Sequence, residues 1–240
     1  MKRITRIEPK TREFLQWLHD RDLLPKVHQN YLQKMRDEGF QPKVIYDIGA
    51  AVLHWSRHAE RIWPDADVYL FDALRAAEFL YEDKNYNIGV LSDSKRVVEF
   101  YENNFEVGGN SYYRENSEFS PNADEMYADE HKVKRMADTL DNVVARRGFP
   151  LPDLIKIDVQ GCEIDILRGA TETLKHCQHL IVELQHVQYN IGAPQVHESV
   201  KIINELGFSL VTPQFSINTL TNKETGEKFS IDGDYHFVRR

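Results

Sequence analysis

Short apolar runs that end in a polar or acidic residue recur along the chain, and segments with helical spacing separate them. Runs of this kind are typical of buried parallel strands. Strands are predicted at 44–49, 68–72, 86–91, 97–100, 154–159, 180–184, 208–211 and 235–238. Because strands that alternate with helices pair in parallel, the pattern predicts a three-layer α/β sandwich with a mostly parallel sheet and an antiparallel edge strand near the C-terminus.

Helices are predicted between these strands, and apolar residues at 14–18 and 31–35 predict helices in the first 40 residues as well. The internal helices are predicted at 53–63, 136–147, 164–174 and 196–206. Gly39 stands where a left-handed residue would end the second N-terminal helix. We therefore divide the chain into an N-terminal helical extension, 1–42, which is expected to pack across the main sheet, and one α/β domain, 43–240.

The segment 102–131 is polar, irregular and rich in aromatic residues. A stretch of this length without periodicity is either a functional loop or a poorly ordered one. Its aromatic side chains suit stacking on the faces of sugar rings. They would equally suit a loop held in place by its own aromatic residues, and the sequence does not decide between these two interpretations.

Composition narrows the class of protein. In 240 residues, 41% are hydrophobic and 28% charged, which is enough to form a folded core. The net charge of −8 disfavours a protein that binds mainly nucleic-acid phosphates or anionic lipid. No apolar run is long enough to span a bilayer, and the first residues lack the apolar core of a signal peptide. With only two cysteines, the expectation is a cytoplasmic protein in a reducing compartment.

Three predicted strands end at an acid, namely Asp47, Asp72 and Asp158. Ligands of such sheets bind at the carboxyl ends of the strands. Gly49, directly after the first strand, would let the backbone approach a ligand closely. A carboxylate at the end of the next strand, Asp72, would accept hydrogen bonds from both hydroxyls of a ribose.

The first turn reads DIGAAVL and holds one glycine, whereas dinucleotide binding requires G-x-G-x-x-G. A nicotinamide or flavin cofactor is therefore disfavoured. A nucleoside ligand without a pyrophosphate fits better, and S-adenosylmethionine is the obvious candidate. The alternative is that Asp47 and Asp72 are ordinary acids at the ends of strands.

The order of the motifs resembles FkbM-type methyltransferases over about residues 43–212. The chain reads, in this order, VIYDIGA, VYLFDA, GVLSDSKRVVEFY, DTLDNV, LIKIDVQGCEIDILRGA and LIVEL. The most specific match is LIKIDVQGCEIDILRGA, because the signature of that family is KID-x-(E/Q)-G-x-E-x-x-(V/L)-x-G. The resemblance implies a Rossmann-like class I fold and O-methylation that depends on S-adenosylmethionine, often of a sugar or polyketide hydroxyl.

The resemblance also implies which residues bind the cofactor. These are Asp47, Gly49, Ala50, Asp72, Ser92 and Asp93. Asp72 stands where the family usually has a glutamate that binds the ribose, and Ser92 and Asp93 match the segment beside the adenine. The signature acids are Asp158 and Glu163.

The first turn departs from the family pattern D-x-G-A-N-x-G, since Ala51 replaces the asparagine and Leu53 the second glycine. Leu53 puts a branched side chain where the backbone often approaches the methionine part of the cofactor. Either the turn is rebuilt and still binds the cofactor, or its affinity is weakened or lost.

Methyl transfer to a hydroxyl requires an aligned nucleophile and a group that removes its proton. The candidates are Asp158, Glu183 and His186, which follow or end the two central strands 154–159 and 180–184. Glu183 is also explained as a structural carboxylate, and His186 as a surface histidine. A divalent ion held by Asp158 and Glu183 is conceivable, but the resemblance does not require it, and no metal is predicted.

The sequence therefore predicts an S-adenosylmethionine-dependent O-methyltransferase whose acceptor is a small molecule or glycan, most simply a sugar hydroxyl in a glycan or glycoconjugate. The alternative is a catalytically degenerate methyltransferase fold that binds a ligand or a partner protein. Nucleic acid is not an expected partner, and the oligomeric state is not predicted.

Overall fold

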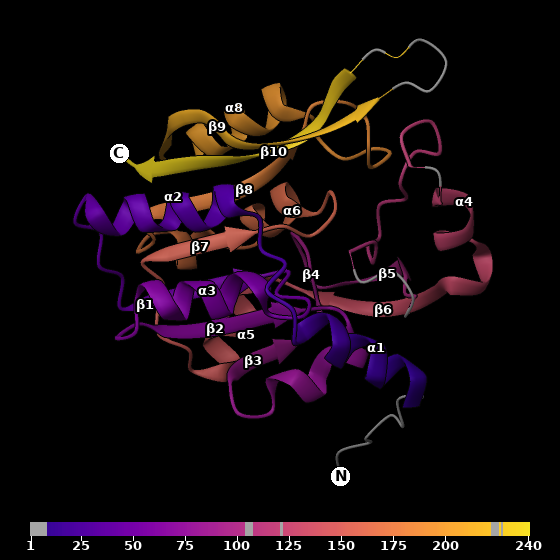
Figure 1. Ribbon diagram of the computed structural model, residues 1–240, viewed down its shortest axis with the longest axis horizontal. Helices are drawn as coiled ribbons and strands as arrows, with labels where there is room; N and C mark the ends of the chain where they lie inside the picture. Colours follow the sequence, from indigo (N-terminus) through magenta and orange to yellow (C-terminus); the bar gives the residue numbers. More distant parts are fainter. Residues whose placement is uncertain (1–8, 104–107, 121, 222–225, 227) are drawn as a thin grey trace.

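The computed structural model describes residues 9–103, 108–120, 122–221, 226 and 228–240. Its main sheet has seven strands in the order β3-β2-β1-β7-β8-β10-β9 (Figure 1). Their bounds are β1 Val44–Ile48, β2 Asp67–Asp72, β3 Asn85–Ile88, β7 Leu154–Ile157, β8 His179–Gln185, β9 Phe208–Thr221 and β10 Lys228–Arg239. The predicted α/β sandwich with a mostly parallel sheet is confirmed.

The antiparallel strand is β10, which pairs antiparallel with both β8 and β9. Together with β9, which forms the edge of the sheet, it makes the antiparallel edge that was predicted near the C-terminus. The chain leaves β8, passes through a helix and forms β9 at the outer edge, and the β9–β10 hairpin then folds β10 back into the gap beside β8.

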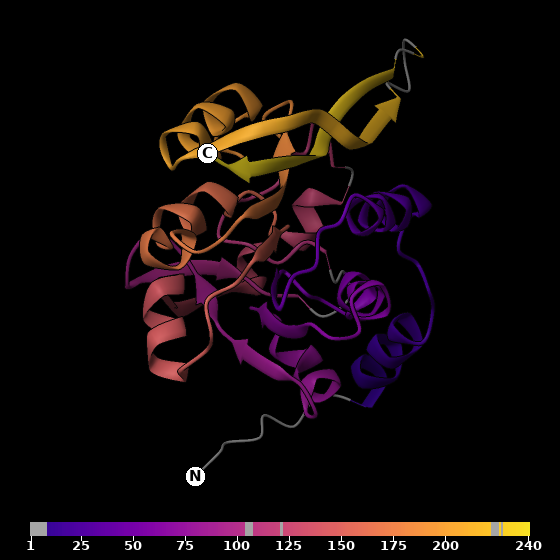
Figure 2. The same ribbon diagram turned by 90° about the vertical axis from the view of Figure 1, so that its left-hand side faces the viewer.

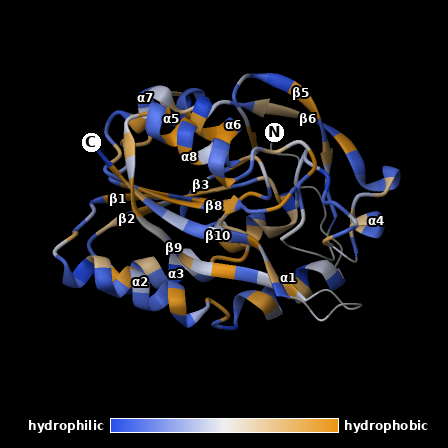
Figure 3. Cartoon of the chain, turned by 90° about the horizontal axis from the view of Figure 1, so that it is seen from above, coloured by the Kyte–Doolittle hydropathy of each residue, from blue (hydrophilic) through white to orange (hydrophobic). Residues whose placement is uncertain are grey.

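Helices cover both faces of the main sheet (Figure 2). One layer holds α2 Lys26–Asp37 and α3 His54–Ile62, and the other holds α5 Leu140–Arg147, α6 Glu163–Arg168, α7 Thr171–Leu174 and α8 Val196–Glu205. Side chains of a strand alternate between the two faces, so Ile45 joins the core with α2 and α3, and Tyr46 the core with α5, α6 and α8. Figure 3 shows the hydrophobic colour concentrated on the central strands.

The first 40 residues form helices, as predicted, and they pack on the sheet. Leu32 and Met35 of α2 are buried in the same core as strands β1 and β2. The Tyr31 hydroxyl lies 2.8 Å from Nδ1 of His236 on β10, which ties α2 to the sheet. Gly39 follows α2 with a φ of +97°, the expected left-handed conformation. α2 therefore shares its core with the sheet. The division of the chain at residue 42 stays a prediction.

The other helices are short. α1 Pro9–His19 packs against the 3₁₀ helix η1 Arg75–Tyr81. Within the segment 102–131 lie α4 Ala123–Met126 and η2 Asp129–His131. In the described part of the chain, no helix combines the length and the apolar character that a bilayer span requires.

A second sheet, in the order β4-β6-β5, stands beyond the carboxyl ends of the central strands (Figure 1). Its strands are β4 Val90–Leu91, β5 Arg96–Tyr101 and β6 Lys132–Asp138. The predicted strand 86–91 is therefore split at Gly89 between the two sheets. The helix predicted at 136–147 is wrong for its first four residues, because 136–138 extend β6 by pairing with β5 and β4, and Thr139 precedes the helix.

Two helix ends follow from local chemistry. Thr139 begins α5 because its side chain accepts a hydrogen bond from the backbone N–H of Asn142. The helix predicted at 164–174 is broken into α6 and α7 at Gly169. A Cβ atom at Gly169 would lie 2.3 Å from the carbonyl oxygen of Ser92, so only glycine fits this approach.

Candidate functional site

A cavity of about 260 Å³ lies at the carboxyl ends of β1, β2, β4 and β7. Apolar side chains such as Phe71, Leu91 and Ile166 line part of it, and the carboxylates of Asp72, Asp158 and Glu183 line the rest. This is the edge of the sheet at which the strand-end acids were predicted to meet. The structure thus brings together Asp72, Asp158 and Glu183 of the predicted site residues.

The first turn is shaped by close backbone contact. Gly49 has a φ of +84°, and a Cβ atom there would lie 1.8 Å from the carbonyl oxygen of Asp158. Any larger residue would therefore collide with the turn after β7 and displace the cavity wall.

The same turn keeps two left-handed residues without glycine. Ala51 has a φ of +44° and Leu53 a φ of +70°, a conformation that costs about 1–2 kcal/mol for residues with a side chain. The Leu53 side chain is 2% exposed and packs in the core with α2 and α3. Ala50 is buried in the same core, and neither Ala50 nor Leu53 lines the cavity.

Asp72 holds the first turn in place. Its Oδ2 accepts a hydrogen bond from the N–H of Ala51 at 2.6 Å, and its Oδ1 accepts one from the N–H of Leu74 at 2.7 Å. Burial raises the pKa of Asp72, and the two backbone amides partly offset this effect. Each carboxylate oxygen can accept a further hydrogen bond, so the side chain can brace the turn and still bind a hydroxyl in the cavity.

Asp47 lies beneath the cavity and does not line it. It is fully buried and accepts a hydrogen bond from the Ser56 hydroxyl, and its Oδ1 lies 3.5 Å from Nζ of Lys156. Burial raises its pKa, against the opposing effect of Lys156. Asp47 therefore acts through its neighbours.

Lys156 connects Asp47 to the cavity wall. Its Nζ lies 3.3 Å from Oδ2 of Asp158 and 3.4 Å from the carbonyl oxygen of Gly49. Burial alone would lower the pKa of Lys156, but Asp158 and Asp47 together raise it above the ordinary value. The ammonium group is therefore charged and neutralises part of the acidic wall.

Asp158 and Glu183 form a coupled pair at the polar end of the cavity. Burial would raise the pKa of Asp158, but Lys156 and a hydrogen bond with Glu183 lower it. Burial and the charge of Asp158 raise the pKa of Glu183 well above its ordinary value. The two pKa values are thus shifted in opposite directions, so Asp158 ionises more readily than Glu183.

Strand β10 adds two acids that sequence reasoning missed. Burial raises the pKa of Asp232 to about 6 and that of Asp234 to about 7. Asp234 also lies 3.3 Å from Nε2 of His28 on α2. The sequence held no clear signal for them, because β10 mixes polar and apolar residues and the hairpin that carries them is distant from every motif.

Glu163 sits behind the turn that follows β7. Its Oε1 accepts hydrogen bonds from the N–H groups of Val159 at 2.9 Å and Gly161 at 3.2 Å. Burial raises its pKa to about 7. Gln160 lies in the same turn, between Val159 and Gly161. It has a φ of +59° and lines the cavity, a role that the sequence did not indicate.

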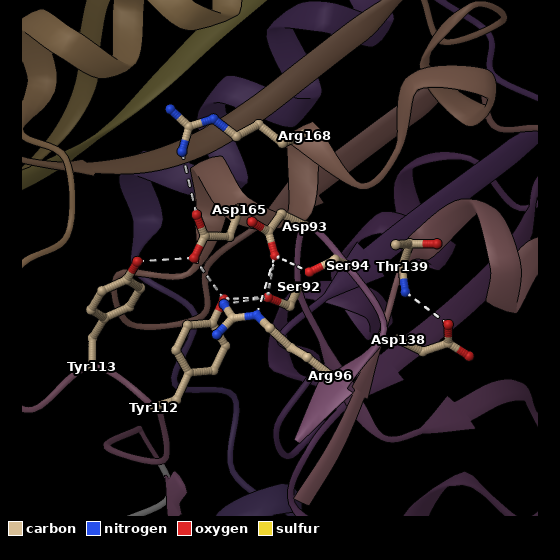
Figure 4. A network of polar contacts seen from close by, with 10 residues as sticks. All are labelled: Ser92, Asp93, Ser94, Arg96, Tyr112, Tyr113, Asp138, Thr139, Asp165 and Arg168. Carbon is tan, nitrogen blue, oxygen red and sulfur yellow. Dashed lines mark hydrogen bonds and ion pairs between the residues drawn. The ribbon is translucent and has the colours of Figure 1, made fainter. Parts of the chain in front are cut away.

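Ser92 and Asp93 lie outside the lining of the cavity, which at this strand consists of Gly89, Val90 and Leu91. Instead they belong to a polar network (Figure 4). The Ser92 hydroxyl accepts a hydrogen bond from Arg96 at 3.0 Å and donates to Asp93, and it lies 3.3 Å from the Tyr112 hydroxyl. These two residues therefore hold the second sheet against the loop.

His186 also lies outside the lining. One ring nitrogen is hydrogen-bonded to the Ser230 hydroxyl, and Nε2 lies 2.7 Å from the Tyr235 hydroxyl. Burial lowers its pKa, so the ring is neutral and both nitrogens are already engaged. The structure does not bring His186 together with Asp158 and Glu183.

Several aromatic residues of the 102–131 segment hold that segment in place. The hydroxyls of Tyr112 and Tyr113 donate to Oδ2 of Asp165 at 3.0 and 2.9 Å (Figure 4). The Tyr127 hydroxyl donates to the buried Glu115. For these three tyrosines, the structure favours the interpretation of a loop held by its own aromatic residues.

A metal site was conceivable at the carboxylate pair. Among the residues that the structure describes, no group of three or more His, Cys, Asp or Glu side chains is arranged to hold a metal ion.

Solved structures that resemble this chain share little sequence identity with it. Precorrin-6y C5,15-methyltransferase from Geobacter metallireducens is 14% identical, with a TM-score of 0.47 over 90% of this chain and 88% of that one. Methyltransferase FkbM from Methylobacillus flagellatus is 11% identical, with a TM-score of 0.45 over 80% of this chain and 43% of that one. The O-methyltransferase TomG from Streptomyces achromogenes is 12% identical, with a TM-score of 0.45 over 97% and 90%.

Comparison with curated proteins gave no significant match. A comparison with family models did, and it covers more than half of the chain. The methyltransferase FkbM domain matches residues 47–210, from Asp47 in β1 to the first residues of β9. The matched region contains the first turn, Asp72, the Asp158–Glu183 pair and the signature segment after β7. The chain therefore belongs to the FkbM family of S-adenosylmethionine-dependent methyltransferases.

Proposed function

We propose that this methyltransferase transfers its methyl group to a hydroxyl, and that the acceptor is a sugar in a glycan or glycoconjugate. The observation that carries the proposal is the Asp158–Glu183 pair, which lies at the polar end of the cavity with Nζ of Lys156 3.3 Å from Oδ2 of Asp158. A carboxylate at this place can take the proton of a hydroxyl as the new bond to carbon forms.

The other end of the cavity fits the cofactor. Gly49 lines the cavity, and because it has no Cβ its backbone packs directly against the carbonyl oxygen of Asp158. Asp72 offers carboxylate oxygens to the ribose hydroxyls, and the apolar residues Phe71, Leu91 and Ile166 offer a surface on which a base can pack. When bound there, S-adenosylmethionine supplies an electrophilic methyl group on a sulfonium centre.

Each polar residue then has a distinct part. Lys156 favours the ionised form of Asp158, and Glu183 orients the Asp158 side chain through their hydrogen bond. Asp158 aligns the acceptor hydroxyl and receives its proton. The amide of Gln160 and that of Asn110 line the same cavity and can hydrogen-bond further hydroxyls, which supports a polyhydroxylated acceptor.

The alternative, a degenerate fold without catalysis, was motivated by Ala51 and Leu53. Both positions keep a left-handed backbone, and the Leu53 side chain packs in the core outside the cavity lining. Neither residue therefore favours that alternative.

The first experiment is calorimetric titration with S-adenosylmethionine and S-adenosylhomocysteine, with NADH as the control. We expect a Kd near or below about 100 μM, about −5.5 kcal/mol, and no binding of NADH. A folded protein that binds neither adenosyl compound would contradict the cofactor assignment.

Acceptors are then tested by transfer of a labelled methyl group to a panel of methyl glycosides. The variant Asp158→Asn should lower kcat by about 100-fold or more, which is the usual weight of a group that takes a proton in the transition state. Its affinity for S-adenosylhomocysteine should change little. If the wild-type protein binds S-adenosylhomocysteine and methylates no sugar, the acceptor class is wrong although the cofactor is right.

A further inference from the structure

A second, much smaller cavity adjoins the first one. Its volume is about 20 Å³, and it shares Gln160 and Glu183 with the lining of the larger cavity. Asn190 and Asp232 form part of its remaining wall. A space of this size holds a single oxygen atom with its hydrogen, as in one water molecule or one hydroxyl group.

Asn190 faces this cavity with an unsatisfied donor. The residue is 3% exposed, and its side-chain Nδ2 has no hydrogen-bond partner among the described residues. A buried amide without a partner costs about 1–3 kcal/mol, so such groups are rare unless something binds them. Carboxylates of Glu183 and Asp232 line the same small space and can accept a hydrogen bond.

The position of Asn190 is fixed by its neighbours. Its N–H donates to Oε1 of Gln185 at 2.8 Å, and its carbonyl oxygen accepts from Nε2 of Gln188 at 2.8 Å. Asn190 also forms a β-bridge with Glu115. A Cβ atom at Gly161 would lie 2.7 Å from the Cβ of Asn190, so a glycine is needed for this approach. The side chain is therefore held at the cavity before any ligand arrives.

We propose that the side-chain amide of Asn190 binds a second hydroxyl of the acceptor, beside the hydroxyl that receives the methyl group. The oxygen of that second hydroxyl accepts a hydrogen bond from Nδ2, and its hydrogen is donated to Glu183 or Asp232. Because Glu183 lines both cavities, the two hydroxyls must be neighbours on the acceptor. Asn190 is thus a specificity-determining residue that selects a diol, as in a sugar ring, over an isolated alcohol or phenol.

This inference rests on the proposed function, and its test separates the two. The wild-type protein is assayed with the methyl glycosides of glucose, mannose, galactose and rhamnose, and each accepted glycoside is compared with its analogues that lack one hydroxyl. We expect one deoxy position, next to the methylated one, to lower kcat/KM by about 100-fold.

In Asn190→Leu, which keeps a similar side-chain volume, that preference for the diol should fall by at least tenfold, mainly through a higher KM. Asn190→Asp keeps the shape and removes the amide donor, so it gives the same test if the leucine variant does not fold. The affinity for S-adenosylhomocysteine should stay within twofold, since Asn190 does not line the larger cavity. Asn204→Leu, near the end of α8, is the control and should keep the wild-type preference.

Variants of Asn190 that retain the full preference for the diol would overturn the inference and leave the proposed function standing. A wild-type protein that binds S-adenosylhomocysteine and methylates no glycoside would overturn both the acceptor class and this inference. A wild-type protein that methylates diol and deoxy acceptors equally would overturn the inference alone.

Discussion

The two ends of the cavity are built in different ways. At the cofactor end, backbone contacts fix the shape of the surface: Gly49 touches the turn after β7, and Asp72 holds the first turn by two backbone amides. At the acceptor end, side chains make the surface, and they come from β7, β8, β10 and the turn at Asn190. A backbone surface tolerates few residue types, whereas a side-chain surface can change its chemistry while the fold stays the same.

A second contrast concerns charge, between the polar network outside the cavity and the acceptor end. In the network of Figure 4, Asp93 and Asp165 are paired with Arg96 and Arg168, so charge is balanced locally. At the acceptor end, several carboxylates surround Lys156, and burial raises the pKa of those that it cannot neutralise. Balanced pairs stabilise the loop, and the unbalanced acids remain available for a substrate.

The largest expected effect tests the backbone surface. Gly49→Ala places a Cβ atom 1.8 Å from a carbonyl oxygen and should lower the free energy of unfolding by about 3 kcal/mol or more. Binding of S-adenosylhomocysteine should be lost. Gly39→Ala is the matched control, because Gly39 also has a positive φ but nothing lies within 4 Å of its Cβ position. Urea denaturation should give a loss of only about 1–2 kcal/mol for the control. Equal losses of stability in both variants would mean that the close contact between Gly49 and the carbonyl oxygen of Asp158 does not shape the cofactor end.

The next largest effect tests whether Asp72 binds the cofactor or only stabilises the end of its strand. Asp72→Asn can accept only one of the two amide hydrogen bonds, and it should weaken S-adenosylhomocysteine binding by at least tenfold in calorimetry. Asp153→Asn is the control, since Asp153 accepts hydrogen bonds from the amides of Lys43 and Val44 at the opposite end of β1. Asp72→Asn should lose about 1–3 kcal/mol of stability, whereas Asp153→Asn can keep both bonds because both amides donate to the same oxygen, Oδ2. A similar loss of affinity in both would show that Asp72 acts only on the fold.

The smallest expected effect is the pH dependence of stability that the buried Glu163 causes. Burial raises the pKa of Glu163 from 4.5 to about 7, so the folded protein holds a proton that the unfolded chain has released. This group therefore destabilises the fold increasingly as pH rises from about 4.5 to 7. Glu163→Gln keeps the acceptor oxygen for the amides of Val159 and Gly161 but does not titrate. Relative to wild type, it should gain stability with pH, by on the order of 1 kcal/mol per pH unit within this window.

The comparison with the variant is needed because His28 and His236 act in the opposite direction. Burial lowers their pKa values to about 4 and about 3, so they favour the folded state as pH rises toward 6.5. The difference between Glu163→Gln and wild type, measured by urea denaturation from pH 5 to 8, cancels that contribution. A difference that does not change with pH would show that Glu163 is ionised throughout.

Several elements could be predicted because local physics specifies them. The apolar runs gave the strands of the main sheet, the spacing of acids gave Asp72 and Asp158, and Gly39 ended its helix in the left-handed conformation. The second sheet could not be predicted. Residues 136–138 have a helical pattern, yet pairing with β5 makes them a strand, since long-range hydrogen bonds outweigh a weak local preference.

The sequence by itself determined the order of strands and helices, the family, and the turn at Gly49, since each depends on residues that are close together in the chain. Only the tertiary structure decided which side chains face the cavity. It excluded Ser92, Asp93 and His186 from the lining, gave Leu53 a place in the core, and brought Asp232 and Asn190 beside Glu183. The physical reason is that a side-chain surface is assembled from separate strands, and their pairing cannot be seen in any one segment.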